Sequence, residues 1–185
     1  LLFLSADHLI EKENLFFNEI KKNQKHLSSK NIFIFGIKPI IPSSEYGYFT
    51  TKKNKKLNQV IKFIEKPNFN KAKNIINKKG YWNSGMFFLR KDSIINNFRK
   101  HQLKTYLNCQ KAVSKSKYIK STYYLNKQAF IKCTPKSFDR AVLEKTKDIN
   151  AIKLDIPWSD LGSWREICKM YDKNKNLYIK KKKYF

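Results

Sequence analysis

Two aspartates near opposite ends of the chain have the residue type and the position to bind a metal ion together. Asp7 follows the apolar run at 1–5, and Asp160 follows a second apolar run at 150–156. If both runs are strands of one α/β sheet, both carboxylates lie beyond the carboxyl ends of strands, where ligands bind in such sheets. Carboxylate oxygens are ligands that Mg²⁺ prefers, so the pair could hold magnesium on substrate phosphates. Spacing alone favours the simpler alternative for each aspartate, a turn residue or a helix cap.

A second group of polar residues stands in "YWNSGMFFLR", residues 81–90. Asn83 carries a hydrogen-bond donor and an acceptor, which suits a sugar hydroxyl, and Gly85 would let a ligand approach the backbone closely. Gly47, between two tyrosines, offers the same close approach, with a bulge in an edge strand as its alternative. The alternative for the larger group is a tight turn with a buried tryptophan, placed before a strand that begins at Met86.

The apolar pattern predicts the strands and helices that would position these residues. Strands are expected at 1–5, 31–37, from about 46, at 58–67, 86–90 and 150–156. Helices are expected at 12–26, 70–79, 92–100, 101–130 and 137–146, with a last one starting at a capping box of Ser163 and Glu166. Because strands alternate with helices, the pattern favours an α/β layered domain with a largely parallel sheet.

The charge of the chain is strongly positive, at +26 for 185 residues. Arginine is the usual side chain for recognising bases and phosphates, yet only four of the 40 basic residues are arginines. The excess of lysine beside asparagine and isoleucine is typical of an AT-rich coding sequence. We therefore favour compositional drift over a selected surface and expect no nucleic-acid partner, with a lysine-rich binder of polyanions as the alternative.

Cysteine use and hydropathy indicate the compartment. The three cysteines, Cys109, Cys133 and Cys168, are far apart in sequence and form no C-x-x-C pair. They predict reduced thiols in a cytoplasmic protein. No apolar run approaches the roughly 18 residues of a membrane helix, so no membrane partner is expected.

Six segments, in order, resemble segments of the bacterial mannose-1-phosphate guanylyltransferases. They are "SADHLI", with Ser5 in place of the family's proline, "FGIKPIIPSSEYGYF", "VIKFIEKPN", "YWNSGMFFLR", "SFDRAVLEKT" and "WSDLGSW". One such segment alone would be a weak signal, but the ordered set covers most of residues 1 to 170. The resemblance implies a Rossmann-like, GT-A-like nucleotidyltransferase core over 1–172, with a mostly parallel mixed sheet, followed by a lysine-rich tail at 173–185.

The same resemblance implies the reaction: mannose 1-phosphate and GTP give GDP-mannose and pyrophosphate. Asp7, Lys66 and Asp160 would then be catalytic, with Asp7 and Asp160 holding Mg²⁺ as the cofactor. The residues expected to bind substrate are Gly47, Glu65, Asn83, Gly85, Asp139 and Lys145. Glu65 would accept hydrogen bonds from sugar hydroxyls while Lys66 meets the phosphate. Without the resemblance, Glu65 and Lys66 are a surface pair, and Asp139 is a helix residue that complements the dipole.

The family's N-terminal glycine-rich nucleotide loop has no counterpart in these residues, and the chain contains five glycines in all. We therefore expect a partial form whose natural start lies upstream of Leu1 and which alone binds GTP poorly. Two alternatives stay open: an enzyme for another sugar 1-phosphate or nucleotide, and a non-catalytic remnant. A homo-oligomer is also left open.

Overall fold

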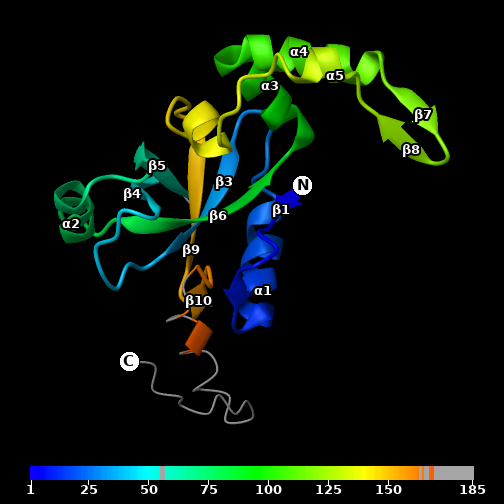
Figure 1. Ribbon diagram of the computed structural model, residues 1–185. Coiled ribbons are helices and arrows are strands. Elements are labelled where there is room, and N and C mark those ends of the chain that lie inside the picture. The colour runs from blue at the N-terminus through cyan, green and yellow to red at the C-terminus, as the bar shows by residue number, and fades with distance from the viewer. Residues whose placement is uncertain (55–56, 163, 165–166, 169–185) are drawn as a thin grey trace, which may run out of the picture.

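The computed structural model describes residues 1–54, 57–162, 164 and 167–168, and its elements are labelled in Figure 1. The strands are β1 (Leu2–Phe3), β2 (Leu9–Ile10), β3 (Ile32–Ile37), β4 (Gly47–Asn54), β5 (Leu57–Ile64), β6 (Tyr81–Leu89), β7 (Lys117–Ile119), β8 (Thr122–Tyr124), β9 (Ile149–Leu154) and β10 (Trp158–Ser159). The helices are α1 (Glu13–Gln24), α2 (Phe69–Asn77), α3 (Lys91–His101), α4 (Leu103–Ser114), α5 (Lys127–Phe130) and the π-helix η1 (Asp139–Leu143).

The main sheet has six strands in the order β1-β6-β3-β9-β5-β4, with helices on both faces, so the mixed α/β sheet is confirmed. The share of parallel pairing is smaller than we expected: within the described residues, β3 and β9 alone run parallel. The reason is connectivity. β4 and β5 follow each other as a hairpin, which must be antiparallel, and β6 runs against β1, β3 and β4.

A further pairing between β4 and β6 closes five of these strands into a ring. Asn83 of β6 lies opposite Gly36 of β3 on one side and Gly47 of β4 on the other. β5 completes the ring by pairing with β9 through Asn58 and Gln59. The start of β4 is therefore held directly against the middle of β6, although the two segments are far apart in the sequence.

Two apolar clusters flank the sheet, and the alternation of side chains along each strand assigns residues to one or the other. On one face, α1 and α2 pack Phe16, Ala72 and Ile75 against aromatic residues of β3 and β6. On the other face, the buried residues of η1 pack against β3 and β9. On β6, Trp82 belongs to the first face and Tyr81 to the second, so Asn83 also projects on the second face, the side of η1.

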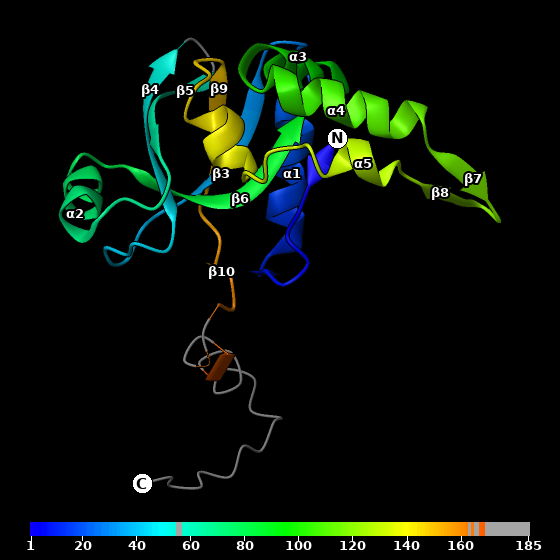
Figure 2. The ribbon, with the colours of Figure 1, turned by 45° about the horizontal axis from the view of Figure 1, so that its top comes forward.

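Two expected elements differ from the structure in a way that bears on function. β6 begins at Tyr81 and not at Met86, so Asn83, Ser84 and Gly85 lie inside a strand and not in a turn before it. The expected helix at 101–130 is interrupted by the hairpin β7–β8, which projects with α4 and α5 as an arm from the body (Figure 2). The capping box at Ser163 and Glu166, and the tail at 173–185, lie outside the described residues.

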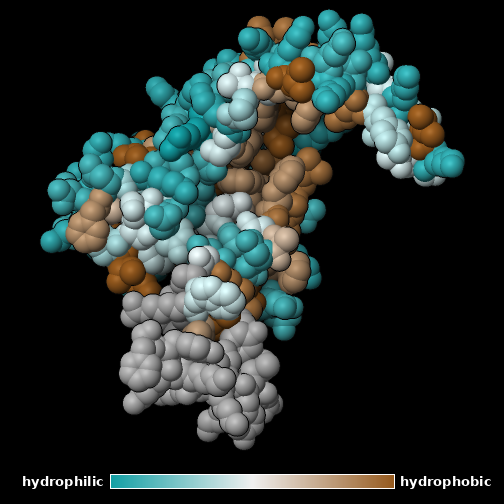
Figure 3. All heavy atoms as spheres, viewed as in Figure 1, coloured by the Kyte–Doolittle hydropathy of each residue, from teal (hydrophilic) through white to brown (hydrophobic). Residues whose placement is uncertain are grey.

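Within the described part of the chain, no helix combines the length and the apolar composition needed to span a membrane. Apolar residues do reach the surface, and Figure 3 shows them gathered in the hollow between α4 and α1. Exposed examples on the neighbouring elements are Phe3, Phe17 and Leu103.

Candidate functional site

A small polar pocket of about 210 Å³ gathers most of the residues that the sequence singled out. It lies where β4 begins, where β5 ends and beside the middle of β6, with η1 and the β2–β10 pair around it. The residues that line it are Ser5, His8, Glu45, Tyr46, Gly47, Glu65, Asn83, Ser84, Gly85, Asp139, Trp158 and Asp160. Of the expected site residues, Gly47, Glu65, Asn83, Gly85, Asp139 and Asp160 are thus brought together.

Gly47 and Glu65 are in direct contact at the mouth of this pocket. A Cβ added at Gly47 would lie 2.5 Å from Oε2 of Glu65 and 3.4 Å from Cβ of Asn83. Any side chain at position 47 would therefore displace the carboxylate of Glu65, because real Cβ contacts are not that short. Gly85 has a positive φ of 74°, a conformation that glycine adopts without strain. The two glycines leave backbone without a side chain beside Asn83, Gly47 across from it on β4 and Gly85 two residues along β6.

The amide of Asn83 is already oriented by the protein. Its Nδ2 donates a hydrogen bond of 2.9 Å to Oδ1 of Asp139, from a residue 56 positions away. A carboxylate can only accept, so this bond fixes which end of the amide faces Asp139. Oδ1 of Asn83 is left buried without a hydrogen-bond partner, in a side chain only 6% exposed. An unpaired buried acceptor is costly, and a ligand hydroxyl would satisfy it.

Two of the carboxyl groups that line the pocket, those of Glu65 and Asp139, are hard to ionise. Burial, and then the like charge of Asp139, raises the pKa of Glu65 to about 7; Lys66 and Arg140 lower it, and Glu144 raises it slightly. Burial also raises the pKa of Asp139, against the lowering effect of its hydrogen bonds with its own backbone and with Asn83. The pocket therefore holds carboxyl groups whose charge changes closer to neutral pH than usual, a property that is typical of functional sites.

The raised pKa of Glu65 predicts a pH-dependent loss of stability. The folded state holds the proton more tightly than the unfolded state, whose pKa is near 4.5. The contribution of protonated Glu65 to the free energy of unfolding is thus fully present below about pH 4.5 and is lost as the pH rises through about 7. Glu65→Gln, which stays neutral, should gain melting temperature relative to the original protein over that range and keep a constant difference above it. Thermal unfolding at several pH values measures this, with Glu45→Gln at the exposed rim as the matched control. A difference that does not vary with pH would contradict the prediction.

Asp7 and Asp160 lie on segments that the structure pairs. In the antiparallel β2–β10 ladder Ser159 is opposite Leu9. Asp160 follows Ser159, and Asp7 precedes Leu9 by two residues, so the two aspartates lie at the same end of this ladder. Asp160 lines the pocket, whereas Asp7 does not: its side chain is 82% exposed and Oδ1 lies 4.0 Å from Nε2 of His8. The imidazole of His8 packs edge-on against Trp158, with ring centroids 5.2 Å apart. Asp7 is therefore at the rim, next to a residue that forms the wall.

The donor set suits magnesium better than a tightly caged metal ion. Within the described residues no cluster of three or more His, Cys, Asp or Glu side chains could hold a metal. Magnesium, however, is usually bound by one or two carboxylates together with substrate phosphates and water. Asp160 can supply such an oxygen, because its half-buried carboxylate lines the pocket while Oδ1 accepts a 3.2 Å bond from the N–H of Gly162. Magnesium at Asp7 and Asp160 thus stays a prediction with which the residues are compatible.

Besides Asp7, two further expected residues lie outside the pocket lining. Lys66 is exposed directly after β5, with a positive φ of 47°, and acts on Glu65 through its charge. Lys145 lines a separate hollow beside β5, and its charge acts on His101. Trp82, the tryptophan of the same segment as Asn83, is buried on the other face of the sheet, where its ring centroid lies 4.6 Å from that of Tyr46.

One residue that the sequence did not single out is Glu144. Its Oε1 accepts a 3.1 Å hydrogen bond from the backbone N–H of Glu65, 79 positions away. Glu144 follows η1, the helix that carries Asp139, so this bond ties Glu65 to the same helix as Asp139. Glu144 belongs to "SFDRAVLEKT", a segment that the family resemblance had already singled out. Only the fold brings that segment to the end of β5.

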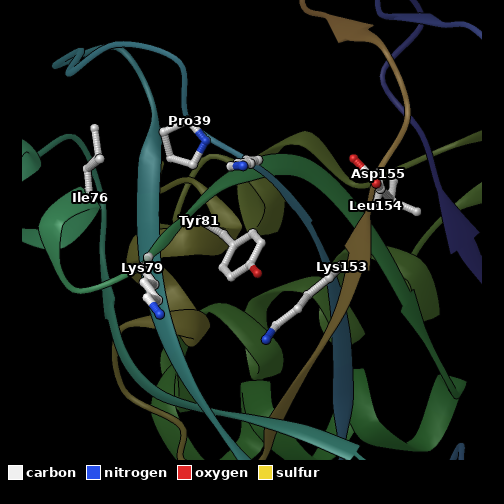
Figure 4. Close-up of a pocket in the computed structure, with 9 residues that line it drawn as sticks. Pro39, Ile76, Lys79, Tyr81, Lys153, Leu154 and Asp155 are labelled. Carbon is white, nitrogen blue, oxygen red and sulfur yellow. The ribbon is translucent and has the colours of Figure 1, made fainter.

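A larger cavity of about 550 Å³ lies at the end of the strand ring, and Figure 4 shows its lining. Lys153 reaches from β9 towards Tyr81, with Nζ 4.9 Å from the ring centroid, and Lys79 lies on the other side of that ring. Asp155 is the one acidic residue among those that line it. Since the lining of this cavity has neither buried unpaired polar atoms nor paired carboxyl groups, we place the candidate site in the smaller pocket.

Comparison with known proteins gives consistent matches. The family model described as nucleotidyl transferase matches residues 1–176. The chain is 33% identical over 190 residues to a mannose-1-phosphate guanylyltransferase of Salmonella montevideo, and 31% identical over 186 residues to the alginate biosynthesis protein AlgA of Pseudomonas aeruginosa. Each match covers 98% of this chain. The chain spans only 40% and 39% of the length of these two relatives.

A solved structure has the same fold. The crystal structure described as a mannose-1-phosphate geranyltransferase from Thermus thermophilus aligns with a TM-score of 0.80. The alignment covers 92% of this chain and 49% of that chain, at 22% sequence identity. At that identity the likeness concerns the fold and not the substrate.

Proposed function

The chain belongs to the nucleotidyl transferase family, and on this premise we propose that it is part of an enzyme that forms GDP-mannose and pyrophosphate from mannose 1-phosphate and GTP. The observation that carries the proposal is the convergence of Gly47, Glu65, Asn83 and Asp160 on one pocket. These residues come from four separate segments, and each has a polar group or a bare backbone suited to a phosphorylated sugar. The names of the similar proteins favour mannose 1-phosphate within that class.

The proposed reaction needs positioning and charge neutralisation, and no covalent intermediate on the protein. A phosphate oxygen of mannose 1-phosphate attacks the α-phosphorus of GTP, a new O–P bond forms, and the bond to the β-phosphate oxygen breaks to release pyrophosphate. Asp160, with Asp7 at the rim, would hold Mg²⁺, which supplies positive charge against the phosphates of both substrates. Lys66 lies outside the pocket lining, where its ammonium group can meet the sugar phosphate at the entrance.

Sugar recognition follows from the hydrogen-bond inventory of the pocket. Asn83 uses a donor on Asp139 and keeps Oδ1 as an acceptor, so it would receive a bond from a sugar hydroxyl. Glu65 accepts as well when ionised, and donates when protonated, which its pKa of about 7 makes accessible. The absence of a side chain at Gly47 allows the sugar to reach the backbone between these groups. The pocket is thus rich in acceptors, which matches a ligand with several hydroxyl donors.

The direct test is a pyrophosphate-release assay with two sugar phosphates and two nucleotides. Mannose 1-phosphate with GTP should give the highest kcat/KM when Mg²⁺ is present. Preference for glucose 1-phosphate or for UTP would support the second candidate, another sugar-1-phosphate nucleotidyltransferase, which the match to AlgA keeps in view. If no combination releases pyrophosphate, from this chain or from a longer form that includes it, the proposal is wrong.

Glu144 should position Glu65 for this reaction. Glu144→Ala removes the acceptor for the N–H of Glu65 and should raise the KM for mannose 1-phosphate about 2- to 12-fold, since one hydrogen bond is worth roughly 0.5–1.5 kcal/mol. Glu144→Gln keeps an Oε1 acceptor and should stay close to the original KM. Because it also removes a like charge, it should lower the pKa of Glu65 in the pH profile. Equal effects of the two variants would show that the hydrogen bond has no positioning role.

A further inference from the structure

The projecting arm carries a pair of thiols that the sequence separates and the fold brings into contact. Sγ of Cys109 lies 3.6 Å from Sγ of Cys133, although the residues are 24 positions apart. All three cysteines are free in the structure, and the sequence separation of Cys109 and Cys133 gave no sign of this contact. We propose that Cys109 and Cys133 are a modification site, an oxidisable pair that becomes a disulfide by exchange with a small-molecule disulfide such as oxidised glutathione.

Both partners are held in place by backbone contacts that do not involve sulfur. Cys109 lies in the middle of α4, within regular helix. Cys133 ends the turn after α5, where its N–H donates to the carbonyl oxygen of Phe130 at 3.0 Å. The neighbouring residues join the two segments directly, since Nδ2 of Asn108 donates to the carbonyl oxygen of Lys132 at 3.1 Å. The approach of the thiols is therefore a property of the α4–α5 packing.

The two sulfur atoms need to move only a short distance to form a bond. A disulfide is about 2.05 Å long, so the two sulfurs, now 3.6 Å apart, must approach by roughly 1.5 Å. Both cysteines are half-buried, so a small thiol reagent can reach them. Within the described residues no third His, Cys, Asp or Glu joins them in a metal-binding group. The contact therefore fits a two-thiol redox site better than a zinc site.

The thiol–disulfide exchange requires only the two cysteines and the small-molecule disulfide, and no other group of the protein. One cysteine thiolate attacks the small disulfide, which forms a mixed disulfide and releases one small thiol. The second cysteine thiolate attacks the protein sulfur of that mixed disulfide, which forms the Cys109–Cys133 bond and releases the second small thiol. Two electrons pass to the reagent, and its two thiol products take up the two protons that the cysteines lose. Burial, and then the contact with Cys133, raises the pKa of Cys109, so less of this thiol is ionised at neutral pH.

The bond would close the arm at its base. The segment between the two cysteines contains the end of α4, the hairpin β7–β8 and α5, which project from the body in Figure 2. Its surface includes the exposed aromatic residues Tyr118, Tyr123 and Tyr124. A cross-link at the base restricts the opening of this segment, because it removes conformations from the open state. The pocket residues lie on other elements, so the cross-link fixes the arm without entering the candidate site.

The test uses the Cys168→Ser protein, in which the pair supplies the only cysteines, treated with oxidised glutathione at about pH 8.5. We expect intact mass to fall by two hydrogen atoms, a tryptic peptide that links Cys109 to Cys133, and cleavage of the β7–β8 hairpin by protease that is at least about tenfold slower than in the reduced protein. Cys109→Ser and Cys133→Ser in the same background are the controls, and each should accumulate one glutathionyl group and keep fast cleavage. A parent protein that accumulates two glutathionyl groups, or none and no link, overturns the proposal. If the disulfide forms but the cleavage rate stays unchanged, the inference that the bond restricts the opening of the arm is wrong.

Discussion

Asp160→Asn should lower the turnover of GDP-mannose formation by about 100- to 1,000-fold, the cost of removing one electrostatic stabiliser from an active site. The amide is neutral and is a poor ligand for Mg²⁺, so the charge on the phosphates would no longer be offset. The substitution is a clean test of charge, because asparagine keeps an Oδ1 that can accept the 3.2 Å bond from the N–H of Gly162. The loop conformation should therefore survive.

The measurement is pyrophosphate release over a range of Mg²⁺ concentrations, and the variant should also need more Mg²⁺ for half-maximal rate. Asp155→Asn is the matched control, because Asp155 is an exposed carboxylate that lies beyond β9 and outside the pocket. It should leave both quantities unchanged. If the turnover of Asp160→Asn stays above half of the original value, Asp160 is not a catalytic residue.

Asn83→Ala should weaken the binding of mannose 1-phosphate by about 1–3 kcal/mol, or roughly 5- to 150-fold. Two losses combine. The sugar loses the buried acceptor Oδ1, and Asp139 loses the 2.9 Å bond that orients its carboxylate and favours its ionised form. The loss of that bond should also raise the pKa of Asp139 further, since the bond with Asn83 lowers it.

Removal of a buried amide also destabilises the fold, so the control variant must lose a similar amount of folding stability. Asn97 provides it: this asparagine is 6% exposed like Asn83, and its Nδ2 donates to the carbonyl oxygen of Ser93 at 2.9 Å within α3. Asn97→Ala should lower the melting temperature by a similar amount and leave the affinity unchanged. Calorimetric titration with mannose 1-phosphate distinguishes the two variants. Equal affinities would show that Asn83 supports the fold and does not recognise the sugar.

The site was predictable from the sequence to the extent that residue type and order reveal it. Gly47, Glu65, Asn83, Gly85, Asp139 and Asp160 were all singled out, and the structure gathers them in one pocket. Asp7, Lys66 and Lys145 were chosen on the same grounds and lie outside its lining. A motif identifies a segment, but it does not tell in which direction each side chain of that segment projects.

The sequence by itself determined the α/β class and the positions of most elements, because the local apolar pattern reports which residues must be buried. The family resemblance also came from the sequence alone, through the six ordered segments. Only the tertiary structure decided how the strands pair, and thus that β4 closes a ring against β6 with Asn83 inside a strand. It alone selected Asp139 as the partner of Asn83, Glu144 as the support of Glu65 and Cys133 as the neighbour of Cys109. These contacts join residues 24 to 79 positions apart, and such pairs depend on chain packing that no local pattern encodes.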